Sequence, residues 1–480
     1  MASVKVNFAY NSFLMVSNYI INFVLFPYCT RVLGVERFGT INFTENIVQY
    51  FVFLGMMGVT HVGVREIAKQ KRKEDRDKCF SSIFGLNMIF TIISLAIYIP
   101  MIFVVNRFAA TRTLFLLGSL QILFTAFSIE WYFRGTENFR YITVRNIIVK
   151  LCYLACVFSF VRSPDDYIVF YLLTVSVTVV CSIINFLYAR RFINLSFREI
   201  NIRRYVKSNL SLGAYSILTS MYTTFNVAYL GFVWGDIQVG YYSTALKLYT
   251  VILGFYSAFT GVMLPRMTNI NVDGNGSAFR SMIHKSFLLL LTISIPLVIV
   301  LYVLAPELVT ILAGESYAAS IDLSRIVVPM LFVVGVAQVL AFQILIPKGF
   351  DKKTLCAAII GAVVGVTSNL ILTTKFGAVG ACVTVVITEI LVTLYYLYVT
   401  TSNKLITFEL SLLVKHIIVA LPYIILCIVP KKIFVGNSAL VLLVSSFLCV
   451  VYFFISQAMV LRNEIITSAI SNFSKRKGHQ

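Results

Sequence analysis

Stretches of about twenty apolar residues follow one another along this chain of 480 residues, separated by short polar segments. A helix of that length rises about 30 Å, which matches the hydrocarbon core of a bilayer. Since only helices and closed barrels satisfy their backbone hydrogen bonds at that depth, the pattern predicts an all-α, polytopic membrane protein. About fourteen transmembrane helices are expected, near residues 8–29, 41–62, 80–105, 114–133, 146–161, 167–189, 210–233, 241–264, 286–305, 326–347, 354–373, 378–400, 416–430 and 437–461.

Lysine and arginine are concentrated in alternate loops between these segments. Roughly three quarters of the 40 basic residues fall on the side of the N-terminus, most densely in 65–78 and 190–207. This bias predicts that both termini are cytoplasmic. The net charge of +20 is therefore expected to reflect topology and contact with anionic lipid. We predict no nucleic-acid partner, because no loop is large enough to form a domain that reads bases or backbone.

Several kinds of site are not expected. Residues 1–7 lack a cationic region followed by a small-residue cleavage site, so the first helix should not be removed as a signal peptide. The 9 cysteines are scattered without a CxxC pattern and the 4 histidines lie far apart, which predicts neither a metal site nor a disulfide framework. The sequence contains no P-loop, and no cofactor is predicted.

The two halves of the chain resemble each other. The segment that begins at Gly39 is similar to the one that begins at Gly240, and residues 33–34 are similar to 230–231. The loop between the two similar parts is four residues longer in the second copy. Six crossings per copy is an even number, so both copies should enter the membrane in the same sense, as in transporters with parallel repeats. We predict two parallel six-helix repeats around a central cavity, followed by two extra C-terminal helices and a basic cytoplasmic tail, with boundaries at 1–205, 206–403 and 404–480.

Polar side chains recur at helical spacing inside the predicted segments. The stripe of the first helix matches the stripe of the seventh, and the second helix carries a further one. If matched helices of both repeats present such stripes, a hydrated substrate path lies between them. The alternative is hydrogen bonding between packed helices. The predicted path residues are Asn18, Asn22, Asn42, Asn46, Gln49, Tyr215, Thr219, Tyr222 and Asn226.

Charged side chains at membrane depth are costly and usually functional. Lys247 and Glu389 are the deepest base and acid, whereas the other candidates lie near the predicted helix ends, where snorkelling is an alternative. Glu130 could also pair with Arg134, one turn further on. Candidates for an electropositive path are Arg31, Arg65 and Lys247, and candidates for ion coupling are Glu45, Glu130 and Glu389.

Several motifs resemble those of the polysaccharide (O-antigen) flippases, in the multidrug and oligosaccharidyl-lipid exporter superfamily. They are NFVLFPYCTRVLG at 22–34, GVREIAK at 63–69, WYFRGTE at 131–137 and GAVGA at 377–381. The resemblance implies a transporter, not an enzyme, in the bacterial plasma (inner) membrane. Its substrate would be an oligosaccharide repeat on undecaprenyl diphosphate, turned outward for synthesis of O-antigen, capsule or exopolysaccharide. Glycosyltransferases and a polysaccharide polymerase would be its pathway partners.

Two other functions stay open at this point. A cation-coupled multidrug exporter of the same superfamily would be expected to present deep carboxylates, and deep acids are few here. A membrane polysaccharide polymerase would need carboxylates or a nucleophile on a sizeable loop. The longest predicted external loop, 306–325, carries only three dispersed acids.

Overall fold

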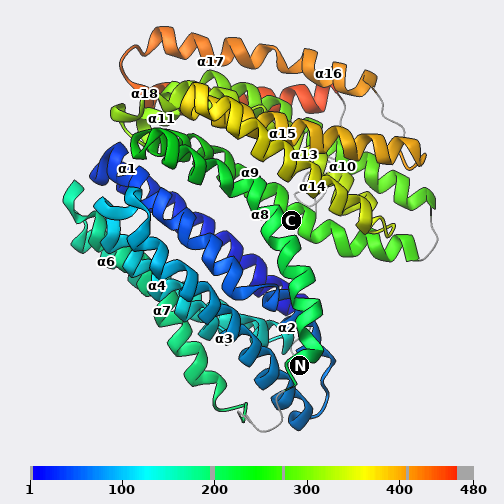
Figure 1. Ribbon diagram of the computed structural model, residues 1–480. Helices are drawn as coiled ribbons and strands as arrows, with labels where there is room; N and C mark the ends of the chain where they lie inside the picture. The colour runs from blue at the N-terminus through cyan, green and yellow to red at the C-terminus, as the bar shows by residue number, and fades with distance from the viewer. Residues whose placement is uncertain (1–3, 195–200, 273–275, 407–409, 462–480) are drawn as a thin grey trace, which may run out of the picture. The chain divides into compact units, whose positions relative to one another are not determined.

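The computed structural model describes residues 4–194, 201–272, 276–406 and 410–461, and within these ranges every regular element is helical (Figure 1). Eleven helical stretches in this part of the chain are long and apolar enough to cross a membrane. Such helices, with their apolar side chains exposed to the surroundings, identify an all-helical, multi-pass membrane protein.

Contacts between residues divide the chain into two compact units, and each is described by itself. The first unit comprises residues 1–243 with 369–377, and the second comprises 244–368 with 378–480. In the first unit, the long helix α1 packs against α3, α4 and α6, which lie beside it in Figure 1. Its elements are α1 (Val4–Met56), α2 (Val59–Lys69), α3 (Lys73–Val104), η1 (Asn106–Thr111), α4 (Arg112–Phe127), α5 (Glu130–Gly135), α6 (Phe139–Phe160), η2 (Pro164–Asp166), α7 (Tyr167–Ala189) and α8 (Arg203–Trp234).

Helix α1 contains two of the predicted membrane segments, joined at Gly34. Its 53 residues would extend about 80 Å as one straight helix, far more than a bilayer requires. Gly34 has φ 72° and ψ 175°, a conformation that interrupts the helix and that other residues seldom adopt. The chain can therefore reverse direction within one continuous helical assignment. Gly377 (φ 56°) divides α15 in the same way.

Two of the sequence motifs pack against each other in the first unit. Trp131 of α5 is buried, and its ring stacks on Phe80 of α3 with the ring centres 5.1 Å apart. A Cβ atom added to Gly63 of α2 would lie 2.5 Å from the Trp131 ring, so only glycine fits there. A Cβ atom added to Gly135 of α5 would lie 2.9 Å from the side chain of Ile67 of α2. The motifs at 63–69 and 131–137 therefore form one interface, which holds α2 against α5.

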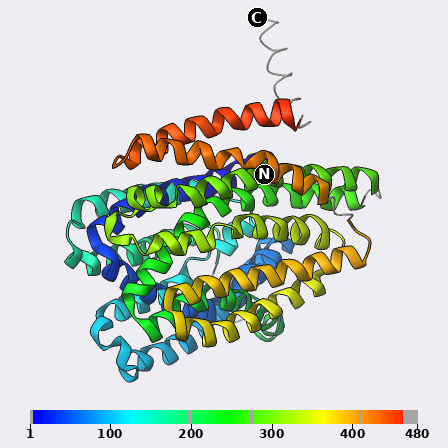
Figure 2. The ribbon, with the colours of Figure 1, turned by 90° about the horizontal axis from the view of Figure 1, so that it is seen from above.

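The second unit is built from the later helices, and α17 lies alongside α18 in Figure 2. Helix α9 begins in the first unit and continues into the second. The elements of the second unit are α10 (Gly276–Val303), α11 (Ala305–Leu312), η3 (Glu315–Tyr317), α12 (Ser320–Val327), α13 (Met330–Gln338), η4 (Val339–Leu345), α14 (Asp351–Ser368), α16 (Leu410–Ala420), α17 (Pro422–Ile433), α18 (Ser438–Ile455) and η6 (Ser456–Val460), with most of α9 (Asp236–Val272) and of α15 (Thr374–Ser402). The short element η5 (Asn369–Thr373) and the start of α15 belong to the first unit.

Several predicted boundaries were wrong. The fifth segment was expected to begin at residue 146, but α6 begins at Phe139, and α10 begins ten residues before the expected 286. The expected loop 306–325 contains α11, η3 and the start of α12. In these places the helix continues beyond the apolar run, or the chain forms short helical turns. Backbone N–H and C=O groups can bond to nearby backbone there even where the side chains are polar, whereas hydropathy alone predicts a loop.

Candidate functional site

The predicted polar stripe on the second half of α1 faces polar groups of α4. Glu45 accepts a hydrogen bond of 2.8 Å from the side-chain amide of Gln121. Its second carboxylate oxygen and the side-chain oxygen of Asn46 are buried, with no hydrogen-bond partner among the described residues. Asn42 instead donates to the carbonyl of Phe38, one turn back on its own helix, at 2.7 Å. Unpaired polar atoms inside the unit are suited to bind water or ligand hydroxyls.

The stripe that runs through the first half of α1 is more exposed. Asn18 is half-buried, whereas Asn22 and Arg31 are exposed. Gln49, on the second half of α1, is half-buried like Asn42 and Asn46. The side chains of Tyr215, Thr219 and Tyr222 lie outside the described residues, so this half of the matching stripe on α8 stays a prediction.

Asn226 takes part in helix packing. It is buried, and its side-chain oxygen accepts a hydrogen bond from Asn369 of η5. Thr373 in turn donates to the side-chain oxygen of Asn369 at 2.7 Å. These bonds match the alternative interpretation of an interhelical hydrogen bond between packed helices.

A very close backbone contact joins the two segments that the sequence repeat had paired. A Cβ atom added to Gly39 would lie 1.8 Å from the carbonyl oxygen of Asp236, and one added to Gly240 would lie 2.3 Å from the carbonyl oxygen of Val35. Residues 35 and 236 are separated by the same 201 residues as 39 and 240. The contact is therefore reciprocal: equivalent positions of the two segments meet each other's backbone.

The turns that precede these segments also match. Gly235 has φ 82° and ψ −175°, nearly the conformation of Gly34, and it too lies 201 residues further along the chain. The sequence comparison had paired Gly34 with Gly231, which was wrong. Gly231 lies within α8, where an added Cβ would be 2.1 Å from the ring of Phe43. The four extra residues therefore extend the end of α8.

An ion pair joins the reciprocal contact to α3 and α4 through η1. Arg107 donates to a carboxylate oxygen of Asp236 at 2.6 Å, and the other oxygen accepts from the hydroxyl of Thr40 at 2.9 Å. The Arg107 guanidinium also donates to the carbonyl of Gly231 and lies 5.2 Å from the ring centre of Phe43. Sequence analysis did not select Arg107 or Asp236, because each falls in a predicted loop. We use the name glycine latch for the contact between the segments of Gly39 and Gly240 together with the ion pair of Arg107 and Asp236.

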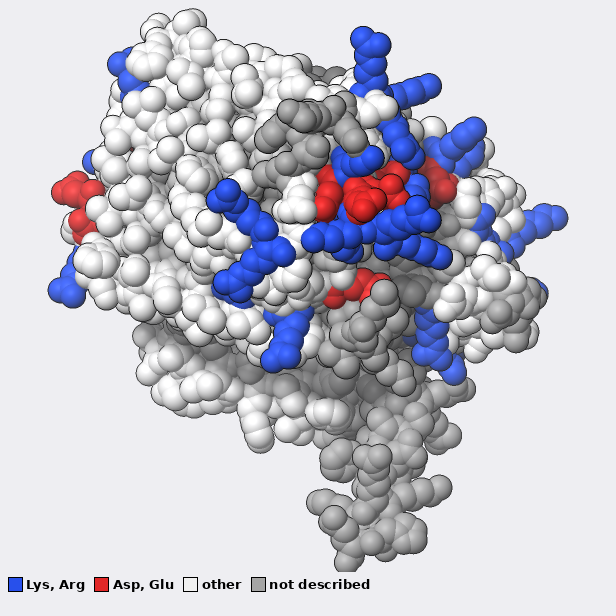
Figure 3. All heavy atoms as spheres, turned by 90° about the horizontal axis from the view of Figure 1, so that it is seen from below, with Lys and Arg blue, Asp and Glu red and all other residues white. Residues whose placement is uncertain are grey.

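The opposite end of the first unit is strongly basic. Arg65 and Lys69 of α2 both donate to the same carboxylate oxygen of Glu66, each at 2.9 Å. The Arg65 side chain stays half exposed, so Glu66 balances only part of its charge. Figure 3, a view of the molecule from below, displays lysine and arginine side chains around a small group of acids on this face.

Glu130 forms two ion pairs. The predicted partner Arg134 is present at 3.4 Å, and Arg145 is closer, at 2.5 Å. Arg145 is only 5% exposed and also donates to Asn146 and Asn185. Sequence analysis placed Arg145 in a loop. The apolar residues at 141, 142 and 144 were the signal that α6 already includes it.

Lys247 and Glu389 belong to the second unit, on α9 and α15, and both side chains are half-buried. The arginines at 31 and 65 belong to the first unit. A cavity shared by these charges is therefore still a prediction.

Comparison with known proteins decides the family. The family model described as "Polysaccharide biosynthesis protein" matches residues 4–271, which is more than half of the chain. The chain belongs to this family. The match includes the α2–α5 interface, both segments of the glycine latch and the polar stripe of α1.

Two curated relatives align with this chain over nearly their whole length. One from Escherichia coli (strain K12) is 24% identical over 409 residues, covering 84% of this chain and 98% of the relative. One from Shigella dysenteriae is 26% identical over 389 residues, covering 79% and 96%. Each bears the name "Putative O-antigen transporter".

Solved structures match the fold from end to end. The lipid II flippase MurJ, in an inward closed conformation, aligns with a TM-score of 0.80 at 16% identity, covering 95% of this chain and 99% of its own. An inward-facing multidrug resistance transporter of the MATE family aligns with a TM-score of 0.59 at 15% identity, covering 85% and 97%. At such identities the likeness establishes the fold alone.

Proposed function

We propose that this protein is a flippase for an oligosaccharide repeat unit linked to undecaprenyl diphosphate. It would move the repeat from the cytoplasmic to the outer face of a bacterial plasma membrane, for synthesis of O-antigen, capsule or exopolysaccharide. The observation that carries the proposal is the near full-length match to two relatives named "Putative O-antigen transporter", together with the family of this chain. Glycosyltransferases would supply the substrate, and a polysaccharide polymerase would consume it.

A wet passage is what such a substrate requires. Each sugar hydroxyl that enters hydrocarbon without a hydrogen-bond partner costs roughly 2 to 7 kcal/mol, so a glycan crosses a bare bilayer extremely slowly. Polar side chains along a cleft replace those hydrogen bonds while the polyprenyl tail stays in lipid. The unpaired oxygens of Glu45 and Asn46 are suited to that role. Asn42 already bonds within its own helix and Asn226 bonds between two helical elements. The proposed path is completed by Asn18, Asn22, Gln49, Tyr215, Thr219 and Tyr222.

The diphosphate calls for positive charge along the same path. We assign this role to Arg31, Arg65 and Lys247. Arg31 is exposed and Arg65 keeps half of its side chain exposed, which supports their access to a ligand. Lys247 would attract the diphosphate as a compact point charge. An interior-negative potential then favours outward movement, by about 2.3 kcal/mol per charge per 100 mV across the full field.

We propose alternating access between two six-helix lobes, residues 1–205 and 206–403, each one copy of a parallel repeat. The last two helices, in 404–480, would be an addition, for fourteen crossings in all. The reciprocal Gly39 and Gly240 contact supports the repeat, because equivalent positions meet each other as expected about a two-fold axis. The positive-inside bias supports cytoplasmic termini, which places the glycine latch on the outer side.

Carboxylates are the candidates for ion coupling. Glu130 is held by two arginines, so protonating it would break two ion pairs, and a structural role fits it better. Glu45 has one unpaired oxygen and Glu389 is half-buried in α15, so these two are the preferred candidates.

The test is genetic and chemical. Deletion of the gene should make the lipid-linked repeat accumulate on the cytoplasmic face, where a lectin reaches it only after the cells are opened. Expression of the wild-type chain should restore outer-face exposure. Expression of the Arg31→Ala, Arg65→Ala and Lys247→Ala triple variant should not, although the variant is produced normally. Unchanged outer-face exposure in the deletion strain, with new sensitivity to cationic drugs, would instead identify a drug exporter.

A further inference from the structure

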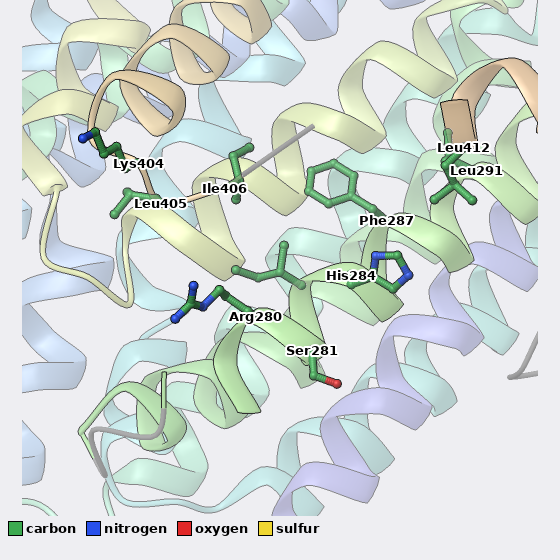
Figure 4. A pocket seen from close by; sticks show the side chains of 10 residues that line it. Arg280, Ser281, His284, Phe287, Leu291, Lys404, Leu405, Ile406 and Leu412 are labelled. Atoms are coloured by element: carbon green, nitrogen blue, oxygen red, sulfur yellow. The ribbon is translucent and has the colours of Figure 1, made fainter. Parts of the chain in front are cut away.

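A cavity of about 360 Å³ lies within the second unit, and none of its described lining residues belongs to the proposed substrate path. It is bounded by the start of α10, the end of α15 with the residues that follow it, and the start of α16. Figure 4 displays Arg280 and Lys404 toward one end, Ile406 and Phe287 between, and Leu291 with Leu412 toward the other end. The cavity is therefore cationic at one end and apolar at the other.

Helix α10 produces this gradient from a single face. Residues 280, 284, 287 and 291 follow the helical spacing that keeps side chains on one side. In order from the helix start they are arginine, histidine, phenylalanine and leucine. Polarity thus falls steadily with depth along the helix, as it does from the headgroups of a bilayer into its acyl chains.

The described lining of the cavity carries positive charge at the mouth. Arg280 and Lys404 are exposed, and no acidic side chain is found among the described residues that line the cavity. The Arg280 guanidinium donates a long hydrogen bond of 3.4 Å to the carbonyl of Gly276, one turn back on the same helix. Two exposed cations beside an apolar wall leave a site that an amphipathic anion complements.

The cavity also lies where three candidate membrane spans begin or end. The apolar spans of α10 and α16 begin beside it, and the long span of α15 ends beside it at Ser402. All three chain segments therefore cross the headgroup region at this point. A ligand with its charge in the headgroups and its chains in the hydrocarbon would match both ends of the cavity.

We propose that this cavity binds an anionic phospholipid of the adjoining leaflet. Its phosphodiester lies between Arg280 and Lys404, and an acyl chain runs past Ile406 and Phe287 toward Leu291. The lipid thereby ties α10 to residues 404–406, which follow α15. A free phosphate would use the two cations but none of the six apolar side chains that line the site. This inference does not depend on the transported substrate.

Binding is measured on the purified full-length chain in detergent, by native mass spectrometry with phosphatidylglycerol or phosphatidylcholine added. Phosphatidylglycerol should bind the wild type at least about tenfold more tightly than phosphatidylcholine. The Arg280→Gln and Lys404→Gln double variant should lose that preference. A matched variant, Lys352→Gln with Lys353→Gln at the exposed start of α14, removes the same charge and should keep it.

Three results would overturn the proposal. Equal preference in the double variant and the matched variant would mean that surface charge alone selects the lipid. If inorganic phosphate displaced phosphatidylglycerol at the concentration at which phosphatidylglycerol itself binds, the cavity would be a site for a small anion and not for a lipid. Displacement of phosphatidylglycerol by a smaller amount of undecaprenyl phosphate would assign the cavity to the transported lipid, which contradicts this inference and leaves the proposed function intact.

Discussion

The glycine latch gives the sharpest prediction. In Gly39→Ala the new methyl group would lie 1.8 Å from the carbonyl oxygen of Asp236, and that atom is backbone that no rotamer change can move. The two helices must separate by roughly 1 to 2 Å, and overpacking of this kind typically costs about 1 to 3 kcal/mol. Only the closed latch bears this cost, so the ratio of closed to open molecules should fall by about 5- to 150-fold.

The assay places spin labels on the two sides of the latch, at Glu36→Cys and Ile237→Cys, in a background without the native cysteines. Both sites are exposed, so the labels should not disturb packing. The wild type should give a short interlabel distance, and Gly39→Ala should transfer population to a longer one. Gly240→Ala should do the same, because its contact is the reciprocal one.

Gly261→Ala is the matched control for these substitutions. It lies on α9 like Gly240, but no atom is found within 4 Å of its added Cβ among the described residues. Its distance distribution should equal that of the wild type. If Gly39→Ala and Gly240→Ala also kept the wild-type distribution while remaining folded, the latch would not be a closing contact and the reasoning would fail.

Three further predictions concern charges. Asp236→Asn should weaken the latch by about 1.5 to 3 kcal/mol, so that a cysteine at Glu36→Cys reacts faster with a thiol reagent added outside. Exchange of the two charges, with Arg107→Asp and Asp236→Arg in one chain, should restore the slow reaction; a reaction that stays fast would speak against the ion pair. Arg145→Met should lower the thermal unfolding midpoint by leaving Glu130 with only its longer ion pair, and Glu130→Gln in the same chain should recover part of the loss; a midpoint within error of the wild type would contradict this. Lys247→Ala should slow flipping about tenfold at unchanged expression, while Lys247→Arg keeps more activity; equal rates in all three chains would remove Lys247 from the path.

The hydropathy pattern was sufficient to predict the fold class, because each membrane helix must be apolar over its whole length. It could not predict how helices join. At Gly34 and at Gly377 the backbone is helical on both sides of a single non-helical residue, so two predicted crossings follow each other without a loop. It also could not place Arg145, since a buried arginine is tolerated only where partners such as Glu130 and Asn185 are near, and these are distant in sequence.

Only part of the candidate site was predictable from the sequence. The repeat was visible because a glycine and the polar spacing that follows it recur 201 residues further along the chain, and it led to Gly39 and Gly240. The ion pair of Arg107 with Asp236 was not visible, because its members lie in separate loops. Polar stripes locate residues on a helix face but do not say which are already bonded, as Asn42 and Asn226 are.

The most direct measurement of the central claim is flipping in reconstituted vesicles. A fluorescently labelled oligosaccharide on undecaprenyl diphosphate is distributed over both leaflets, and an impermeant quencher is added outside. Vesicles with the wild-type chain should lose nearly all of the fluorescence, while vesicles with the Arg31→Ala, Arg65→Ala and Lys247→Ala chain should lose only the outer-leaflet half. Loss of the outer half alone with the wild type, at verified insertion and with an imposed potential, would contradict the account.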